Sequence, residues 1–111
     1  MISDMPIVIT LVDSNDKRIR GIPDPWGSFF DAAGHFDRLV GEAPALPIWN
    51  SLDPDALVLI DRDGAKQLIE ELPTILAKAR PGLESRGLER LRILAQICAS
   101  SEALHLVARG D

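Results

Sequence analysis

The clearest helical pattern of the chain lies in residues 61–100, which read DRDGAKQLIEELPTILAKARPGLESRGLERLRILAQICAS. In the first half, the apolar residues are spaced to share one face of a helix: Ala65, Leu68, Ile69, Leu72, Ile75, Leu76 and Ala79. Asp61 or Asp63 is the expected N-cap, because a carboxylate there can accept the free amides of the first turn. Pro73 is expected to kink or restart this helix, and Pro81-Gly82 to end it.

A second helix is predicted from Ser85 or Gly87 to Ser100. Its apolar residues cover more than half of the circumference: Leu88, Leu91, Ile93, Leu94, Ala95, Ile97 and Cys98. So wide a stripe predicts burial on two sides, against the first helix and against a sheet. Cys98 is the only cysteine, which excludes an intrachain disulfide, and its place in the stripe indicates a buried core thiol.

The remaining apolar runs are short and predict strands. Residues 6–13 are apolar on both faces, as in a central strand, and residues 18–22 are expected to pair back on them. Further strands are expected at residues 48–52, 56–60 and 103–108. We therefore expect an α+β fold in which a C-terminal helical hairpin packs on one face of a small antiparallel sheet of four to five strands. A length of 111 residues predicts a single domain over residues 1–111.

The formal charge of −5 is unevenly distributed. Residues 1–63 carry five basic and eleven acidic side chains, whereas residues 64–100 carry six basic and four acidic ones. A net-acidic chain repels phosphate backbones, so no nucleic-acid partner is expected. Arginines alternate with glutamates in the second half and are interpreted as a solvated helix face: Arg80, Arg86, Arg90 and Arg92. No apolar run is long enough to cross a membrane, and with a single cysteine we expect a cytoplasmic protein without a membrane partner.

Several short phrases resemble a known group of proteins: Phe30-Asp31-Ala32-Ala33-Gly34, Phe36-Asp37-Arg38-Leu39, Ser51-Leu52-Asp53-Pro54, the PGLESRGL of residues 81–88 and the closing Gly110-Asp111. Over nearly its whole length the chain is similar to a group of short uncharacterised actinobacterial proteins of unknown function. In that group, Asp-Pro is usually followed by a Tyr-Gly-Asp-Thr-like run, where this chain has Asp55-Ala56-Leu57-Val58. The resemblance implies a small soluble protein and brings no catalytic residues.

Two short segments contain residues that can bind metal ions. Asp31 and His35 would share a helix face at i, i+4, with Asp37 close by, but two oxygens and one imidazole are a thin ligand set. The Asp61–Gly64 run resembles the start of a calcium loop, yet Lys66 and Leu72 stand where that loop needs glycine and glutamate. No metal and no cofactor are expected.

His105 with Ser100 or Ser101 could form a nucleophile pair. The local sequence offers neither an oxyanion donor nor a carboxylate to orient the histidine. We interpret His105 as a strand residue and predict no catalytic residue.

All five aromatic residues lie in residues 26–49, part of which, 29–40, is expected to be helical. They could simply cover the open face of the sheet, or form an exposed anchor patch with an acidic rim of Asp24, Asp31, Asp37 and Glu42. Aromatic anchors with a charged rim are how protein partners are commonly held. The candidate partner-binding residues are Trp26, Phe29, Phe30, Asp31, His35, Phe36, Asp37 and Trp49.

The leading functional hypothesis is a non-catalytic protein-binding module, immunity- or antitoxin-like, which neutralises or regulates a basic partner such as a nuclease-like toxin. An acidic rim would favour such a partner. One alternative is a small enzyme or ligand binder with a pocket under residues 26–49 and Asp31, His35 and Asp37 as its polar groups. The other is a homodimer that uses the aromatic patch or a sheet edge.

Overall fold

The computed structural model describes residues 6–41 and 45–110 of the chain. The strands are β1 (Ile7–Val12), β2 (Ile22–Pro23), β3 (Phe29–Phe30), β4 (Ala32–Ala33), β5 (Val58–Ile60) and β6 (His105–Gly110). The helices are α1 (Pro47–Asn50), α2 (Arg62–Leu76) and α3 (Leu83–Ala99), with a short 3-10 helix, η1 (Asp37–Leu39). Within these described residues, no helix is long and apolar enough to span a bilayer.

Four strands form an antiparallel sheet in the order β4-β1-β6-β5. The central position of β1 follows from its composition, because a strand with neighbours on both sides and apolar residues on both faces is best buried in the middle. Ile9 shows the register, since it lies opposite Ala33 of β4 on one side and Ala108 of β6 on the other. Strands β2 and β3 pair separately as a small second sheet.

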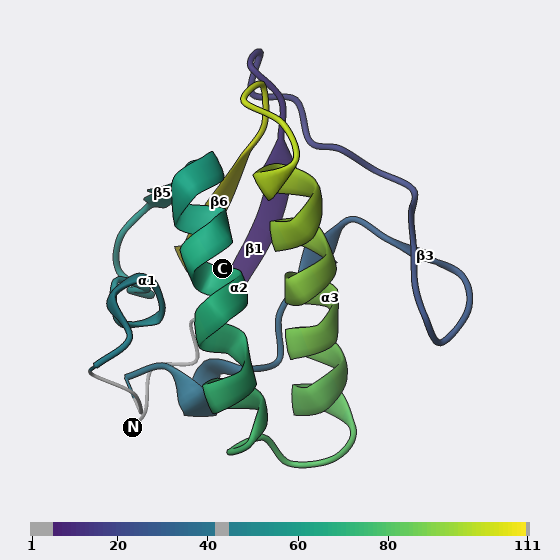
Figure 1. The fold of residues 1–111 in the computed structure, drawn as a ribbon. Coiled ribbons are helices and arrows are strands. Elements are labelled where there is room, and N and C mark those ends of the chain that lie inside the picture. Colours follow the sequence, from purple (N-terminus) through teal and green to yellow (C-terminus); the bar gives the residue numbers. More distant parts are fainter. Residues whose placement is uncertain (1–5, 42–44, 111) are drawn as a thin grey trace.

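Helices α2 and α3 lie side by side over one face of the four-stranded sheet (Figure 1). Ile7, Ile9 and Leu11 alternate along β1 and are buried together with Leu91 and Leu94 of α3 in one core. The predicted α+β fold, with a helical hairpin packed on an antiparallel sheet, is confirmed.

The ends of the two long helices are close to those predicted. Asp61 is the N-cap of α2, and its Oδ1 accepts a hydrogen bond from the Gly64 amide at 2.8 Å. Pro73 does not restart α2, which runs continuously through it to Leu76 with the proline ring exposed. Gly82 precedes α3 with φ of 101°, a conformation that favours glycine.

The strand predicted at residues 48–52 is wrong, since these residues lie largely in helix α1. Pro47 occupies the first turn, where its missing amide costs nothing. The buried carboxylate of Glu71 accepts the next two amides, of Ile48 at 3.1 Å and of Trp49 at 2.7 Å. A side chain of α2 therefore caps α1, and this cap cannot be read from residues 48–52.

The helix predicted over residues 29–40 is also wrong. His35, inside this range, has a positive φ of 69°, which no right-handed helix can contain, and Ser28 just before it has a φ of 65°. The segment instead forms β3, β4 and η1. Residues 18–22 do not form a full partner for β1: an isolated bridge joins Val12 to Arg18, and β2 pairs with β3.

Helix α3 approaches the turn after β4 more closely than any side chain would allow. A Cβ atom placed on Gly87 would lie 1.9 Å from the carbonyl oxygen of Gly34. This position is therefore restricted to glycine although glycine weakens helices.

We expect Gly87→Ala to lower the free energy of unfolding by about 3 kcal/mol or more, although alanine usually stabilises a helix relative to glycine. The control is Gln96→Ala, an exposed position of α3, which should change the free energy of unfolding by less than about 0.5 kcal/mol. Urea unfolding followed by circular dichroism measures both. A Gly87→Ala protein as stable as the parent would show that the two backbones are not in contact.

Candidate partner-binding site

Residues 22–30 form a hairpin, called the arm below, which stands out from the side of the molecule next to α3 (Figure 1). Its turn is held by two backbone hydrogen bonds, from the Asp24 amide to Ser28 O at 3.1 Å and from the Gly27 amide to Asp24 O at 2.9 Å. Asp24 Oδ1 also accepts the Trp26 amide at 3.0 Å. Gly27 and Ser28 supply the positive φ values that so tight a turn requires.

Two arginines of α3 hold the arm. The Arg90 guanidinium forms an ion pair with the buried carboxylate of Asp24 and lies 5.5 Å from the centre of the Phe30 ring. One helical turn earlier, the Arg86 guanidinium lies 5.5 Å from the centre of the Trp26 ring. Arg86 and Arg90 share a helix face because they are four residues apart, so both meet the arm.

The chemistry of Asp24 keeps this attachment charged. The hydrogen bond from the Trp26 amide, followed by that from Arg90, holds the pKa of Asp24 below its usual value, although burial acts in the opposite direction. The carboxylate is therefore ionised at neutral pH and remains a counter-ion for Arg90.

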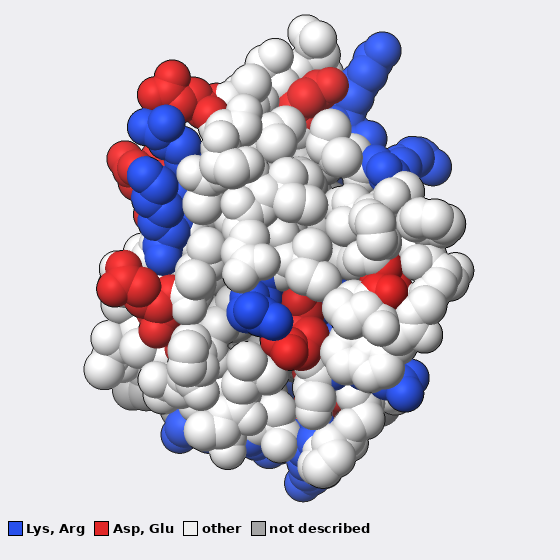
Figure 2. Space-filling model, turned by 45° about the vertical axis from the view of Figure 1, so that its right-hand side comes forward, with Lys and Arg blue, Asp and Glu red and all other residues white. Residues whose placement is uncertain are grey.

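The outer side of the arm presents two aromatic rings to solvent. The side chain of Trp26 is 47% exposed and that of Phe29 is 68% exposed. Figure 2, which turns this side forward, shows a surface of mainly uncharged residues with a few separate basic and acidic groups.

The other three aromatic residues are buried, which corrects the expectation of a single exposed patch. Phe36 and Trp49 are fully buried with their ring centres 5.5 Å apart, and Trp49 Nε1 donates to Leu39 O at 2.8 Å. Phe30, the last residue of the arm, is buried, with the Arg90 guanidinium over its ring. Phe36 and Trp49 therefore belong to the core on the helix side of the sheet, whereas Trp26 and Phe29 are exposed.

The acidic rim expected around the aromatics is mostly paired within the molecule. Besides Asp24, Asp37 Oδ1 accepts the Ile7 amide at 2.6 Å and so anchors the start of β1. Asp31 lies 3.7 Å from Arg18. Glu42, the fourth residue of that rim, lies outside the described residues.

The pocket expected under residues 26–49 takes a different form. His35 and Asp37 do share an open hollow of about 520 Å³, but Asp31 and the aromatic rings are not part of its lining. Both acidic residues of this hollow are already bonded: Asp37 accepts the Ile7 amide, and Glu84 accepts two hydrogen bonds from Arg38, at 2.7 and 2.8 Å. Among residues 6–41 and 45–110, no cluster of three metal-ligating side chains occurs.

The remaining candidates for chemistry have structural roles. Burial raises the pKa of Cys98 to about 11, so this thiol belongs to the core as predicted. Ser100 Oγ donates to Ile97 O at 2.6 Å, and Ser101 Oγ accepts the Ala103 amide at 3.2 Å. His105 faces Asp16, with 3.7 Å between Nε2 and Oδ1.

The sequence interpretation missed the supports of the arm. The charge pattern of Arg86 and Arg90 predicts a solvated helix face, but each guanidinium lies over an aromatic ring, and that of Arg90 also pairs with the buried carboxylate of Asp24. Their i, i+4 spacing was visible, but nothing in the sequence connects them to residues 60 positions earlier.

Comparison of the chain with protein-family models, with curated proteins and with solved structures found no match.

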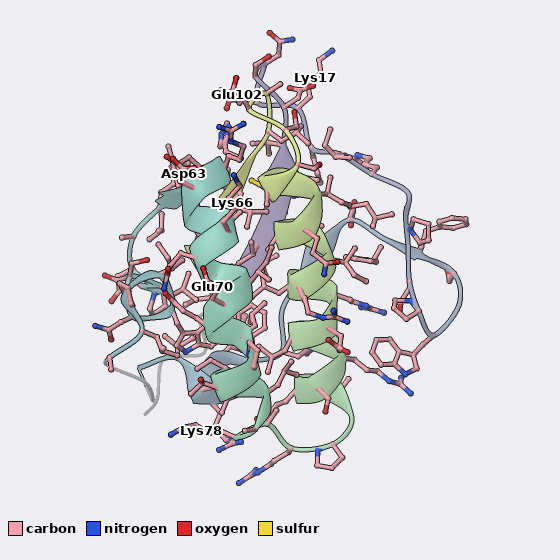
Figure 3. The ribbon with its side chains drawn as sticks, in the orientation of Figure 1. Lys17, Asp63, Lys66, Glu70, Lys78 and Glu102 are labelled. Carbon is pink, nitrogen blue, oxygen red and sulfur yellow. The ribbon has the colours of Figure 1, made fainter. Side chains whose placement is uncertain are left out.

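Glu84 gives the Arg38 contact a defined pH dependence. Hydrogen bonds from Arg38 and from the Arg80 amide lower the pKa of Glu84 from 4.5 to about 2. A carboxylate with a lowered pKa stabilises the fold above its unfolded value, and this contribution is lost as the pH falls toward 2. We expect the stability gap between the parent and Glu84→Gln to narrow from pH 6 to pH 2 in urea titrations. The control Glu70→Gln, at an exposed position of α2 (Figure 3), should show a constant small gap; a constant gap for Glu84→Gln would refute the contact.

Asp24→Asn should release the arm from α3, because Arg90 loses its counter-ion. Hydrogen–deuterium exchange of residues 22–30 is expected to become about tenfold faster or more, with α2 and α3 unchanged. Asp31→Asn is the matched control, since the Asp31–Arg18 pair is longer and exposed. Equal exchange in both variants would contradict the anchoring role of Asp24.

Proposed function

We propose that this protein is a non-catalytic protein-binding module that docks its partner through the arm. The observation that carries the proposal is the exposure of Trp26 and Phe29 on a hairpin that Arg90 and Arg86 hold in one position. Tryptophan is among the residues that contribute most to binding at protein interfaces.

The anchored geometry matters as much as the exposed rings. A flexible loop would lose conformational entropy on binding, whereas a hairpin already held by an ion pair and two ring contacts loses little. Both rings are largely exposed in the isolated molecule, although Trp26 also lies against Arg86, and a partner that covers them would bury both.

The class of function we favour is regulation of a second protein, as immunity proteins and antitoxins do. The net charge of −5 supports attraction of a basic partner over long range. Because Asp24 and Asp31 are already paired, the arm itself offers apolar contact, and the attraction must come from acidic groups elsewhere. A reducing compartment such as the cytoplasm suits the single buried thiol of Cys98.

Affinity capture tests the arm directly. Tagged parent protein, the double variant Trp26→Ala/Phe29→Ala and the control Leu83→Ala are each used as bait in a lysate of the cells that make the protein. Leu83 is a suitable control because it is an exposed apolar residue outside the arm. We expect a protein that the parent and the control retain and the double variant loses.

The captured protein is then purified and titrated calorimetrically. Loss of the Trp26 and Phe29 side chains should raise the Kd about 30-fold or more, which corresponds to about 2 kcal/mol of binding free energy. Unchanged melting temperatures keep the comparison free of folding effects. An affinity that does not depend on Trp26 and Phe29 would contradict the proposed function.

A further inference from the structure

Strand β5 forms the edge of the four-stranded sheet that lies farthest from β4. Strand β5 pairs with β6 alone, and no strand of residues 6–41 or 45–110 lies on its other side. Leu59 of β5 and Leu57, the residue just before β5, are 62% and 59% exposed. An open edge offers unpaired backbone groups, and exposed leucines beside it offer apolar contact.

Each end of this edge adjoins a hollow. The larger, of about 580 Å³, begins at Leu59 and contains the acidic side chains of Asp61, Asp63 and Glu102. The smaller, of about 280 Å³, begins at Leu57 and contains Asp55 and Arg109. Figure 3 shows Asp63, in the first turn of α2, and Glu102, shortly before β6, at the same end of the molecule.

The charges along this edge are predominantly negative. Residues 51–63 contain four aspartates and one arginine, and that arginine, Arg62, already pairs with Glu102 at 3.1 Å. We propose that the β5 edge binds an extended segment of a basic protein, with apolar residues over Leu57 and Leu59 and a Lys or Arg near each end.

A second copy of this chain fits the β5 edge less well, because its own β5 strand has the same acidic residues at its ends. Antiparallel pairing of two β5 strands would bring Asp55 of one copy toward Asp61 of the other. Parallel pairing would bring each aspartate near its own equivalent. Both arrangements place like charges together, whereas a strand with basic ends relieves the existing repulsion.

The β5 edge is separate from the arm, because β4, which follows the arm in the chain, and β5 lie at opposite edges of the sheet. It does supply the acidic surface that the proposed regulation of a basic partner needs. A partner could engage the arm and the edge separately, and each surface is testable without the other.

The test uses the full chain, labelled with ¹⁵N, and a capped peptide of sequence Lys-Ile-Thr-Val-Thr-Ile-Lys. We expect amide shifts confined to residues 57–61 and their β6 neighbours, at millimolar peptide or below. Two control peptides are matched in length: one replaces both Lys by Glu, and the other replaces the central Val by Pro, which cannot extend a sheet. Neither should bind, and added salt should weaken the parent peptide.

Variants of the chain separate the contributions. Asp55→Asn and Asp63→Asn should each weaken the peptide roughly two- to fivefold, and Leu59→Ala should do so as well. Asp31→Asn, an acidic residue away from the edge, and Trp26→Ala/Phe29→Ala should bind as the parent does, so failure of the arm and failure of the edge give different results.

Three outcomes would overturn the inference. No shifts at residues 57–61 would show that the edge does not accept a strand, and equal binding of the Glu peptide would show that charge does not select it. Sedimentation that shows a dimer abolished by Leu59→Asp would assign the edge to a second copy.

Discussion

The contact between the backbones of Gly87 in α3 and Gly34 after β4 determines where the arm lies. A side chain on residue 87 would occupy the space of the Gly34 carbonyl oxygen. The helix and the turn can therefore approach this closely only because residue 87 is glycine. Because β4 is fixed against α3, the hairpin that precedes β4 lies on the outer face of that helix. Arg86 and Arg90 of that face then meet Trp26, Phe30 and Asp24. The candidate site is therefore a consequence of a backbone contact in the core.

A second constraint divides the aromatic segment between core and surface. The buried carboxylate of Glu71 accepts the amides of Ile48 and Trp49 and a hydrogen bond from Gln67 at 3.0 Å. A buried charge is tolerated only when it is well hydrogen-bonded, and these three donors satisfy it. Once α1 is held in this way, Trp49 lies in the core against Phe36. In the arm, by contrast, only the two ends, Ile22 and Phe30, belong to the core, and the rings of Trp26 and Phe29 nearer the turn are exposed.

The predictable part of the structure is the part with strong periodicity. The two long helices, the central strand and the N-cap at Asp61 follow from spacing and local chemistry, and the α+β fold follows from their need to bury apolar faces. The segment between β1 and β5 could not be predicted in the same way, because its strands have two residues each and its short helix is capped by Glu71, more than twenty residues away. The anchoring of the arm could not be predicted for the same reason, because Asp24 and Arg90 are 66 residues apart in the sequence.

The distribution of charge links the two surfaces. Several acidic side chains of the first half perform structural tasks: Asp24 binds Arg90, Asp37 anchors β1, and Asp61 caps α2. Asp55 and Asp63 lie in the hollows at the two ends of β5, the edge strand that would otherwise pair with another strand. Charged ends are how proteins protect a short sheet edge from pairing with copies of themselves. The same charges that oppose self-pairing select a basic strand, so protection and recognition at this edge have one physical cause.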